Sequence, residues 1–176
     1  ASSGKQTEAL LADLASASAL TRDGAVARLT ILGERAVPRL VALATDLDAS
    51  SDTRVAALQA LEGIADPRAF DPSVNLLDDG EERVSVAAVG VLQAFLQSTR
   101  GVEALDRITA LATDRRRPRA VRLAAIRAVR DLGPATIAPL LEALGSDPDR
   151  TIAVAAGLGP EGGSDPVFLL KEAAEG

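Results

Sequence analysis

The chain has 176 residues and a formal net charge of -6, and it contains no His, Cys, Met, Trp or Tyr and only three Phe. The lack of His and Cys excludes disulfides, thiol nucleophiles, Ser-His-Asp triads and the commonest metal ligands. At 47% hydrophobic and 25% charged residues, the composition is typical of a folded domain. Since no apolar run is long enough to cross a bilayer, no transmembrane segment is predicted.

Abundant Ala and Leu favour helices, and Gly and Pro mark the breaks between them. The hydrophobic spacing predicts eleven helices, at residues 5–17, 22–32, 35–45, 53–64, 68–78, 82–97, 101–113, 118–131, 135–145, 149–158 and 165–174. We expect one domain over residues 1–176, capped by the first and last of these helices. Residues 1–4 are expected to be disordered or to mark a processed N-terminus.

A repeat of about 33 residues runs along the chain. Pro38, Pro72, Asp106 and Pro139 are each followed by apolar residues two and five places later, and they are 34, 34 and 33 residues apart. A second helix begins in each repeat, and its equivalent positions are Arg22, Arg54, Ser85, Arg122 and Thr151. Two helices per repeat predict an all-α fold, a short α-solenoid of about five helix pairs.

The pattern resembles the HEAT-repeat family, in particular the bacterial HEAT-like repeats that also occur in phycobilin lyases. The likeness rests on Val37-Pro38, on Ala60-Leu61 with Asp66-Pro67, and on Val121-Arg122 with the alanines that follow. It covers nearly the whole chain. It implies a right-handed stack of repeats whose second helices line a concave side where partners dock.

The resemblance also implies an Asp in the turn, six places before the Arg of the second helix. Asp48 precedes Arg54 in this way, but Asp79 precedes Ser85, and Arg116 precedes Arg122. A continuous Asp–Arg ladder is therefore not expected. Asp79 can still reach Arg54 or Arg122 from a neighbouring repeat. The alternative is that Asp48 and Asp79 only cap helices.

An arginine cluster is the sharpest local feature, because seven of the 19 basic residues lie within sixteen positions. Its members are Arg115, Arg116, Arg117, Arg119, Arg122, Arg127 and Arg130. The last four fall within about 140° of arc on one helix. Guanidinium groups bind carboxylates and phosphates bidentately. The alternative is that these arginines pair with acids of neighbouring repeats, such as Asp79, Asp147 and Asp149.

A second feature is a stripe along the second helices that avoids large apolar residues. Gln59 with Glu62, Gly90 with Gln93, and Arg127 with Arg130 occupy equivalent places three residues apart. We expect this stripe to face solvent. Gly90 in mid-helix points to a close approach by a neighbouring helix or a ligand, because glycine weakens a helix by roughly 1 kcal/mol relative to alanine.

The sequence favours a non-enzymatic protein-binding scaffold or an accessory subunit of a larger bacterial assembly, without a cofactor or bound metal. Its candidate binding residues are Gln59, Glu62, Gln93 and the seven arginines, and the expected partner is a protein with an acidic segment. One alternative is a chromophore chaperone resembling phycobilin lyases. The other is a nucleic-acid-binding HEAT-like protein acting through Arg115–Arg130, which the acidic balance and the lack of aromatics disfavour. The pattern fits the cytoplasm or, after signal removal, the periplasm, and predicts no oligomeric state.

Overall fold

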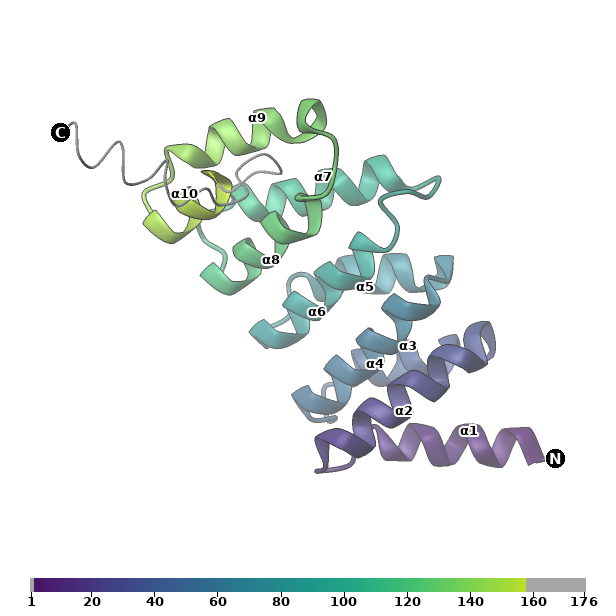
Figure 1. Cartoon of the computed structure of the whole chain (residues 1–176). Helices are drawn as coiled ribbons and strands as arrows, with labels where there is room; N and C mark the ends of the chain where they lie inside the picture. Colours follow the sequence, from purple (N-terminus) through teal and green to yellow (C-terminus); the bar gives the residue numbers. More distant parts are fainter. Residues whose placement is uncertain (1, 158–176) are drawn as a thin grey trace. The chain divides into compact units, whose positions relative to one another are not determined.

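The computed structural model describes residues 2–157 of the chain (Figure 1). The chain divides into two compact units, Ala1–Ile108 and Thr109–Gly176, and each is described by itself. The helix expected at 165–174, Phe168 and most of the glycine-rich segment at 157–163 lie outside the described residues. A single domain therefore stays a prediction.

The first unit is built from three helix pairs. Its helices are α1 (Ser2–Asp13), α2 (Ala19–Leu32), α3 (Val37–Thr45), α4 (Ser51–Ile64), α5 (Phe70–Leu76) and α6 (Glu82–Gln93). Within the pairs, α1 packs on α2, α3 on α4 and α5 on α6. Between pairs, α4 lies against α2 on one side and α6 on the other, so the second helices form one layer (Figure 1).

The second unit holds the remaining described helices. The helix α7 (Gly101–Thr113) begins in the first unit and ends in the second, and α8 (Arg119–Val129), α9 (Pro134–Gly145) and α10 (Arg150–Gly157) follow it. Here α10 packs on both α9 and α8. Over residues 2–157 the structure has ten α-helices and two short 3-10 turns but no strand, which confirms the all-α solenoid of HEAT-like helix pairs.

Local signals in the sequence explain where the helices begin and end. Ser18 and Ser50 cap α2 and α4, because each side chain accepts a hydrogen bond from the backbone N–H three residues later. Gly33 ends α2 with a φ of 66°, a conformation that favours glycine. The first helix differs from the prediction, since it begins at Ser2 and ends at Asp13. Residues 2–4 are therefore helical rather than disordered.

The core lies between the two layers of helices. Leu61 and Val129, which occupy the same repeat position, are 1% and 0% exposed, as their pattern predicts. In the first unit Phe70 packs edge-on against Phe95, with ring centroids 5.3 Å apart. The guanidinium carbon of Arg100 lies 3.6 Å from the centre of the Phe70 ring, so a cation packs on the face of this ring. Both phenylalanines are buried in the core.

Candidate functional site

Four of the five described turns from a first to a second helix carry an aspartate with the same local geometry, and in the turn between α1 and α2 Ser16 takes its place. The carboxylate of Asp46, Asp79, Asp114 or Asp147 accepts the backbone N–H of the residue two places later. Such a side-chain turn is a common use of aspartate. Asp48 and Asp79 are not the N-caps of α4 and α6, which are Ser50 and Glu81, so the capping alternative is wrong.

In the first unit, one of these aspartates holds a buried arginine. Arg54, on α4, donates from Nη2 to Oδ2 of Asp79 at 2.6 Å and from Nη1 to Oδ1 at 3.2 Å. Its Nε donates to the carbonyl of Ala44 at the end of α3, at 2.9 Å. The two charged side chains are only 4% and 9% exposed. Hydrogen bonding by Arg54 lowers the pKa of Asp79. The expectation that Asp79 reaches Arg54 from the next repeat is confirmed.

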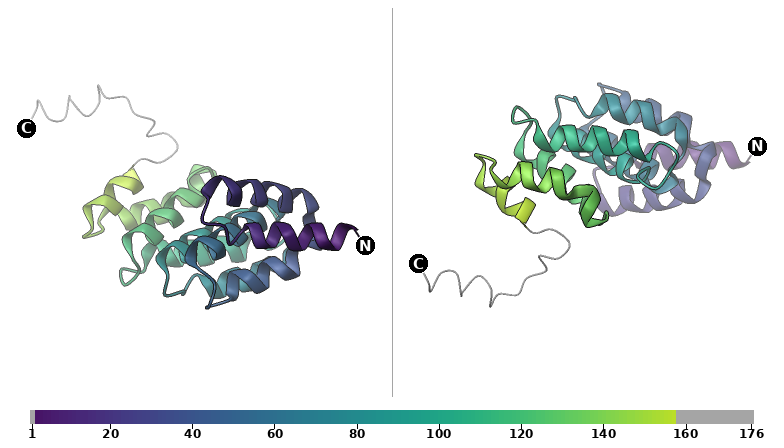
Figure 2. Two further views of the ribbon diagram at one scale, coloured as in Figure 1. Left: turned by 90° about the horizontal axis from the view of Figure 1, so that it is seen from below. Right: turned by 90° about the horizontal axis from the view of Figure 1, so that it is seen from above.

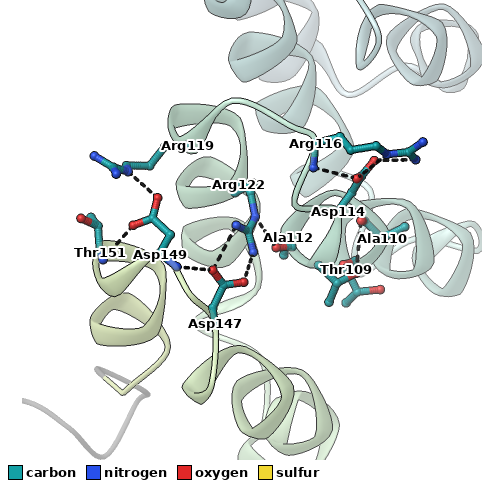
Figure 3. Close-up of polar contacts among 11 residues, drawn as sticks. Thr109, Ala110, Ala112, Asp114, Arg116, Arg119, Arg122, Asp147, Asp149 and Thr151 are labelled. Carbon is teal, nitrogen blue, oxygen red and sulfur yellow. Dashed lines mark hydrogen bonds and ion pairs between the residues drawn. The ribbon is translucent and has the colours of Figure 1, made fainter.

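The second unit repeats this arrangement (Figure 3). Arg122 on α8 forms a bidentate pair with Asp147 in the turn between α9 and α10, and its Nε donates to the carbonyl of Ala112 at 2.9 Å. Both side chains are 4% exposed, and the pKa of Asp147 is lowered because Arg122 donates to its carboxylate. Arg122 is therefore a structural residue and is not available to a partner.

Three more arginines of the cluster are paired with acids. Arg119 donates to Asp149 at 2.6 Å across the start of α10, and this lowers the pKa of Asp149. Arg116 and Arg117 pair with Asp114 in their own turn, at 3.0 and 3.4 Å. Arg116, the main cause, lowers the pKa of Asp114 to about 2. Arg119 and Arg122 thus pair with acids of a neighbouring repeat, as the alternative states, whereas Arg116 and Arg117 pair with an acid of their own turn.

What remains of the cluster is a smaller cationic surface. Arg127 and Arg130, three residues apart on α8, are exposed and half-buried respectively, and Arg115 is exposed in the preceding turn. No hydrogen bond or ion pair joins the guanidinium group of any of the three to another described residue, although Arg115 also contributes to lowering the pKa of Asp147. A guanidinium without an acid next to it is free to bind a carboxylate from outside.

The part of the stripe in the first unit faces solvent, as predicted. Gln59, Glu62 and Gln93 are all exposed. The close approach expected at Gly90 is made by a neighbouring helix: a Cβ added to Gly90 would lie 2.7 Å from Oε2 of Glu62 on α4. Contact with α6 takes one side of this carboxylate out of water, and this desolvation raises its pKa.

Among residues 2–157, no group of three or more acidic side chains could hold a metal ion. No helix of that segment is long and apolar enough to cross a membrane.

Stacked helix pairs with a repeated arginine–aspartate link give this chain the fold of a HEAT-like repeat array. Residues 121–146 match the family model of the PBS lyase HEAT-like repeat. The fold is similar to that in the complex of CpcE and CpcF of phycocyanin lyase from Nostoc sp. PCC7120, with a TM-score of 0.71 and 24% identity over 86% of this chain and 96% of that chain. The search of curated proteins gave no match.

The two buried arginine–aspartate pairs were not identified from the sequence as one repeated interaction. Arg54 and Asp79 are 25 residues apart, as are Arg122 and Asp147. That common offset is the signal that could have found them, because it joins one repeat to the turn of the next.

Proposed function

We propose that the chain is a non-catalytic protein-binding module that recognises an acidic segment through Arg127 and Arg130. The main support for this proposal is that the arginines of the cluster differ in whether they have an acidic partner within the chain. Arg116, Arg117, Arg119 and Arg122 are paired with acids of the same chain, whereas Arg127 and Arg130 are not. Side chains three residues apart on a helix share a face, so both guanidinium groups can engage one partner.

The supporting chemistry is that of bidentate carboxylate recognition. Guanidinium forks match the carboxylate geometry and stay charged at all physiological pH values. Charge complementarity of this kind speeds association and weakens as salt is added. The match to a complex of two proteins supports a protein as the partner.

The test compares two double variants with the same change of charge. Arg127→Glu/Arg130→Glu reverses the free arginines, and Arg28→Glu/Arg35→Glu reverses two exposed arginines on the first unit. Each is used to capture proteins from an extract of the source cells, at low and at high salt. A partner that the wild type and the control retain, and that the Arg127/Arg130 variant loses, supports the proposal.

Calorimetry with that partner then gives the affinity. We expect the Arg127/Arg130 variant to lose about 2–5 kcal/mol of binding free energy, the range for desolvated charged contacts. An equal affinity for wild type and variant would refute the proposal. Circular dichroism of both variants checks that the fold is intact.

A second candidate function is bilin handling, which the likeness to the CpcE and CpcF complex of phycocyanin lyase favours. Tetrapyrroles of this class carry propionate carboxylates, which Arg127 and Arg130 can pair with. The chain has no His, Cys, Tyr or Trp that would contact the pigment. Titration of the protein with biliverdin, followed by absorbance, tests this function, and a spectrum unchanged by the protein would refute it.

A further inference from the structure

The helix α2 carries an apolar face that no described residue covers. Leu20 and Ile31 are each 84% exposed, the highest values among the large hydrophobic side chains of residues 4–157. Gly24 and Ala27 lie between them, and the four residues fall within about 60° of arc on the helix. A methyl group at Gly24 would meet no atom within 4 Å. The face is therefore open along three turns of helix.

The equivalent face of the later second helices is a stacking surface. On α4, Asp52 lies 3.6 Å from Arg22 of α2, and a Cβ added to Gly63 would lie 2.8 Å from Thr30 of α2. On α6, Gly90 meets Glu62 of α4 in the same way. By repeat position, Leu20 corresponds to Asp52 and Ile31 to Gly63. The exposed face of α2 thus continues the stacking surface of the first unit, and the left view of Figure 2 shows α1 and α2 in front of the later helices of that unit.

The residues on this face do not suit a solvent-exposed end. An exposed helix face normally carries polar side chains. Here, the two exposed positions are Leu and Ile, whereas the next repeat has Asp52 and Gly63 at those places. Large aliphatic side chains exposed together on one helix are typical of an interaction site. Because Leu and Ile would not fit the close stacking seen at Gly63, the occupant packs at a greater distance than the repeats do.

We propose that this face binds a second copy of the chain, with the two α2 helices antiparallel about a two-fold axis. The order of the face is large, small, small, large at positions 20, 24, 27 and 31, which is symmetric about the midpoint of Ala25 and Val26. An antiparallel copy therefore sets its Ile31 beside Leu20 and its Ala27 beside Gly24. A self-complementary patch of this kind closes a dimer.

The expected dimer is weak and driven by apolar contact. One helix of 14 residues on each side makes a small interface, at the low end for specific complexes. We expect a Kd of about 10–100 µM. Each copy carries a net charge of -6, so added salt screens their repulsion and favours the dimer. This salt response is opposite to that expected of the Arg127/Arg130 surface, and the inference does not depend on that surface.

Sedimentation equilibrium from about 1 to about 500 µM brackets this affinity and tests the proposal. Ile31→Glu should raise the Kd at least about 10-fold, because it places a carboxylate in the apolar contact. Leu47→Glu is the matched control, since Leu47 is 81% exposed in the turn after α3, and it should leave the Kd unchanged. A wild-type chain that stays monomeric throughout, or equal effects of both variants, would overturn the proposal.

Cross-linking tests the antiparallel geometry directly, because the chain has no Cys of its own. Positions 20 and 31 are about 16 Å apart along the helix axis at 1.5 Å per residue. A short bismaleimide should therefore join Leu20→Cys chains to Ile31→Cys chains in a mixture and should join neither variant to itself. Efficient self-linking of Leu20→Cys would indicate parallel helices and would overturn the two-fold arrangement. A circular dichroism spectrum checks that each variant folds.

Discussion

Breaking the buried pair of Arg122 and Asp147 is expected to destabilise the fold far more than breaking any other ion pair of the arginine cluster. In the variant Arg122→Ala, the carboxylate of Asp147, only 4% exposed, loses both of its guanidinium bonds. The carbonyl of Ala112 loses its donor as well. Removal of one partner of a buried pair typically costs about 3–5 kcal/mol.

The matched control is Arg116→Ala in the preceding turn. Arg116 also donates to an aspartate through Nε and Nη2, but its side chain is 90% exposed. Exposed pairs contribute less than about 1 kcal/mol. The two variants therefore remove the same chemical group from the same cluster, and they differ mainly in burial.

A third variant tests whether the destabilisation comes from leaving one buried charge unpaired. In Arg122→Met/Asp147→Leu, no charge is left unpaired and the volume is largely kept, so the expected loss is smaller than that of Arg122→Ala, although the bonds to the Ala112 carbonyl and the Asp149 N–H are lost. Together with the single variants Arg122→Met and Asp147→Leu, the double variant gives the coupling between the two residues.

Urea denaturation followed by far-ultraviolet circular dichroism is the appropriate assay, because the chain has no Trp or Tyr for fluorescence. Arg54→Ala, which breaks the equivalent pair of the first unit, should show the same large loss. If Arg122→Ala and Arg116→Ala shift the unfolding free energy equally, burial does not decide the strength of these pairs and the reasoning is refuted.

Three further predictions follow from pKa shifts and packing. The pKa values of Asp79 and Asp147 are lowered on folding, so their stabilisation is present above the unfolded value of about 3.9 and is lost as the pH falls through the folded values. Acid titration should show a larger loss of stability in the wild type than in Arg54→Ala, which keeps only the pair of Arg122 and Asp147. The pKa of Glu62 is raised, so its charged form is disfavoured in the folded state. Glu62→Gln should therefore stabilise the fold at pH 7 by less than about 1 kcal/mol. Urea denaturation should show no such gain below the pKa that Glu62 has in the unfolded chain. Leu61→Ala should lower the unfolding free energy by about 2–5 kcal/mol in the same assay, because Leu61 is 1% exposed, and a loss comparable to that of a surface variant would contradict this assignment.

The helix pairs could be predicted from the sequence because their signals are local. Apolar residues at helical spacing, Ser at the starts and Gly or Pro at the ends are all read within one turn of helix. The errors occur where these signals are weak. Residues 2–17 are mainly polar and small, and Gly4 does not interrupt the helix, which begins and ends three to four residues earlier than predicted.

The candidate site was only partly predictable, because contacts between repeats determine which of its arginines are buried in ion pairs and which are exposed. In sequence, Arg122 and Arg127 look alike, since both are arginines of one basic segment. The structure buries Arg122 against Asp147 and leaves Arg127 exposed without a described partner. The difference comes from an aspartate 25 residues away, and no signal within one helix contains it.

The repeated offset also explains why the ladder is interrupted. Ser85 occupies the position of Arg54 and Arg122, and its hydroxyl donates to the backbone carbonyl of Asp79 instead. The aspartate that comes next in the series, Asp114, has its carboxylate held by the arginines of its own turn. The acid is thus retained in the four turns that follow α3, α5, α7 and α9, because the turn itself uses it. The long link forms at Arg54 and Arg122 but not at Arg22, whose guanidinium donates to the carbonyls of Ser16 and Ala17. Arg116 and Arg117 therefore pair with Asp114 where no long link forms. A search for the binding surface of this chain should begin at Arg127 and Arg130, which have no such structural role.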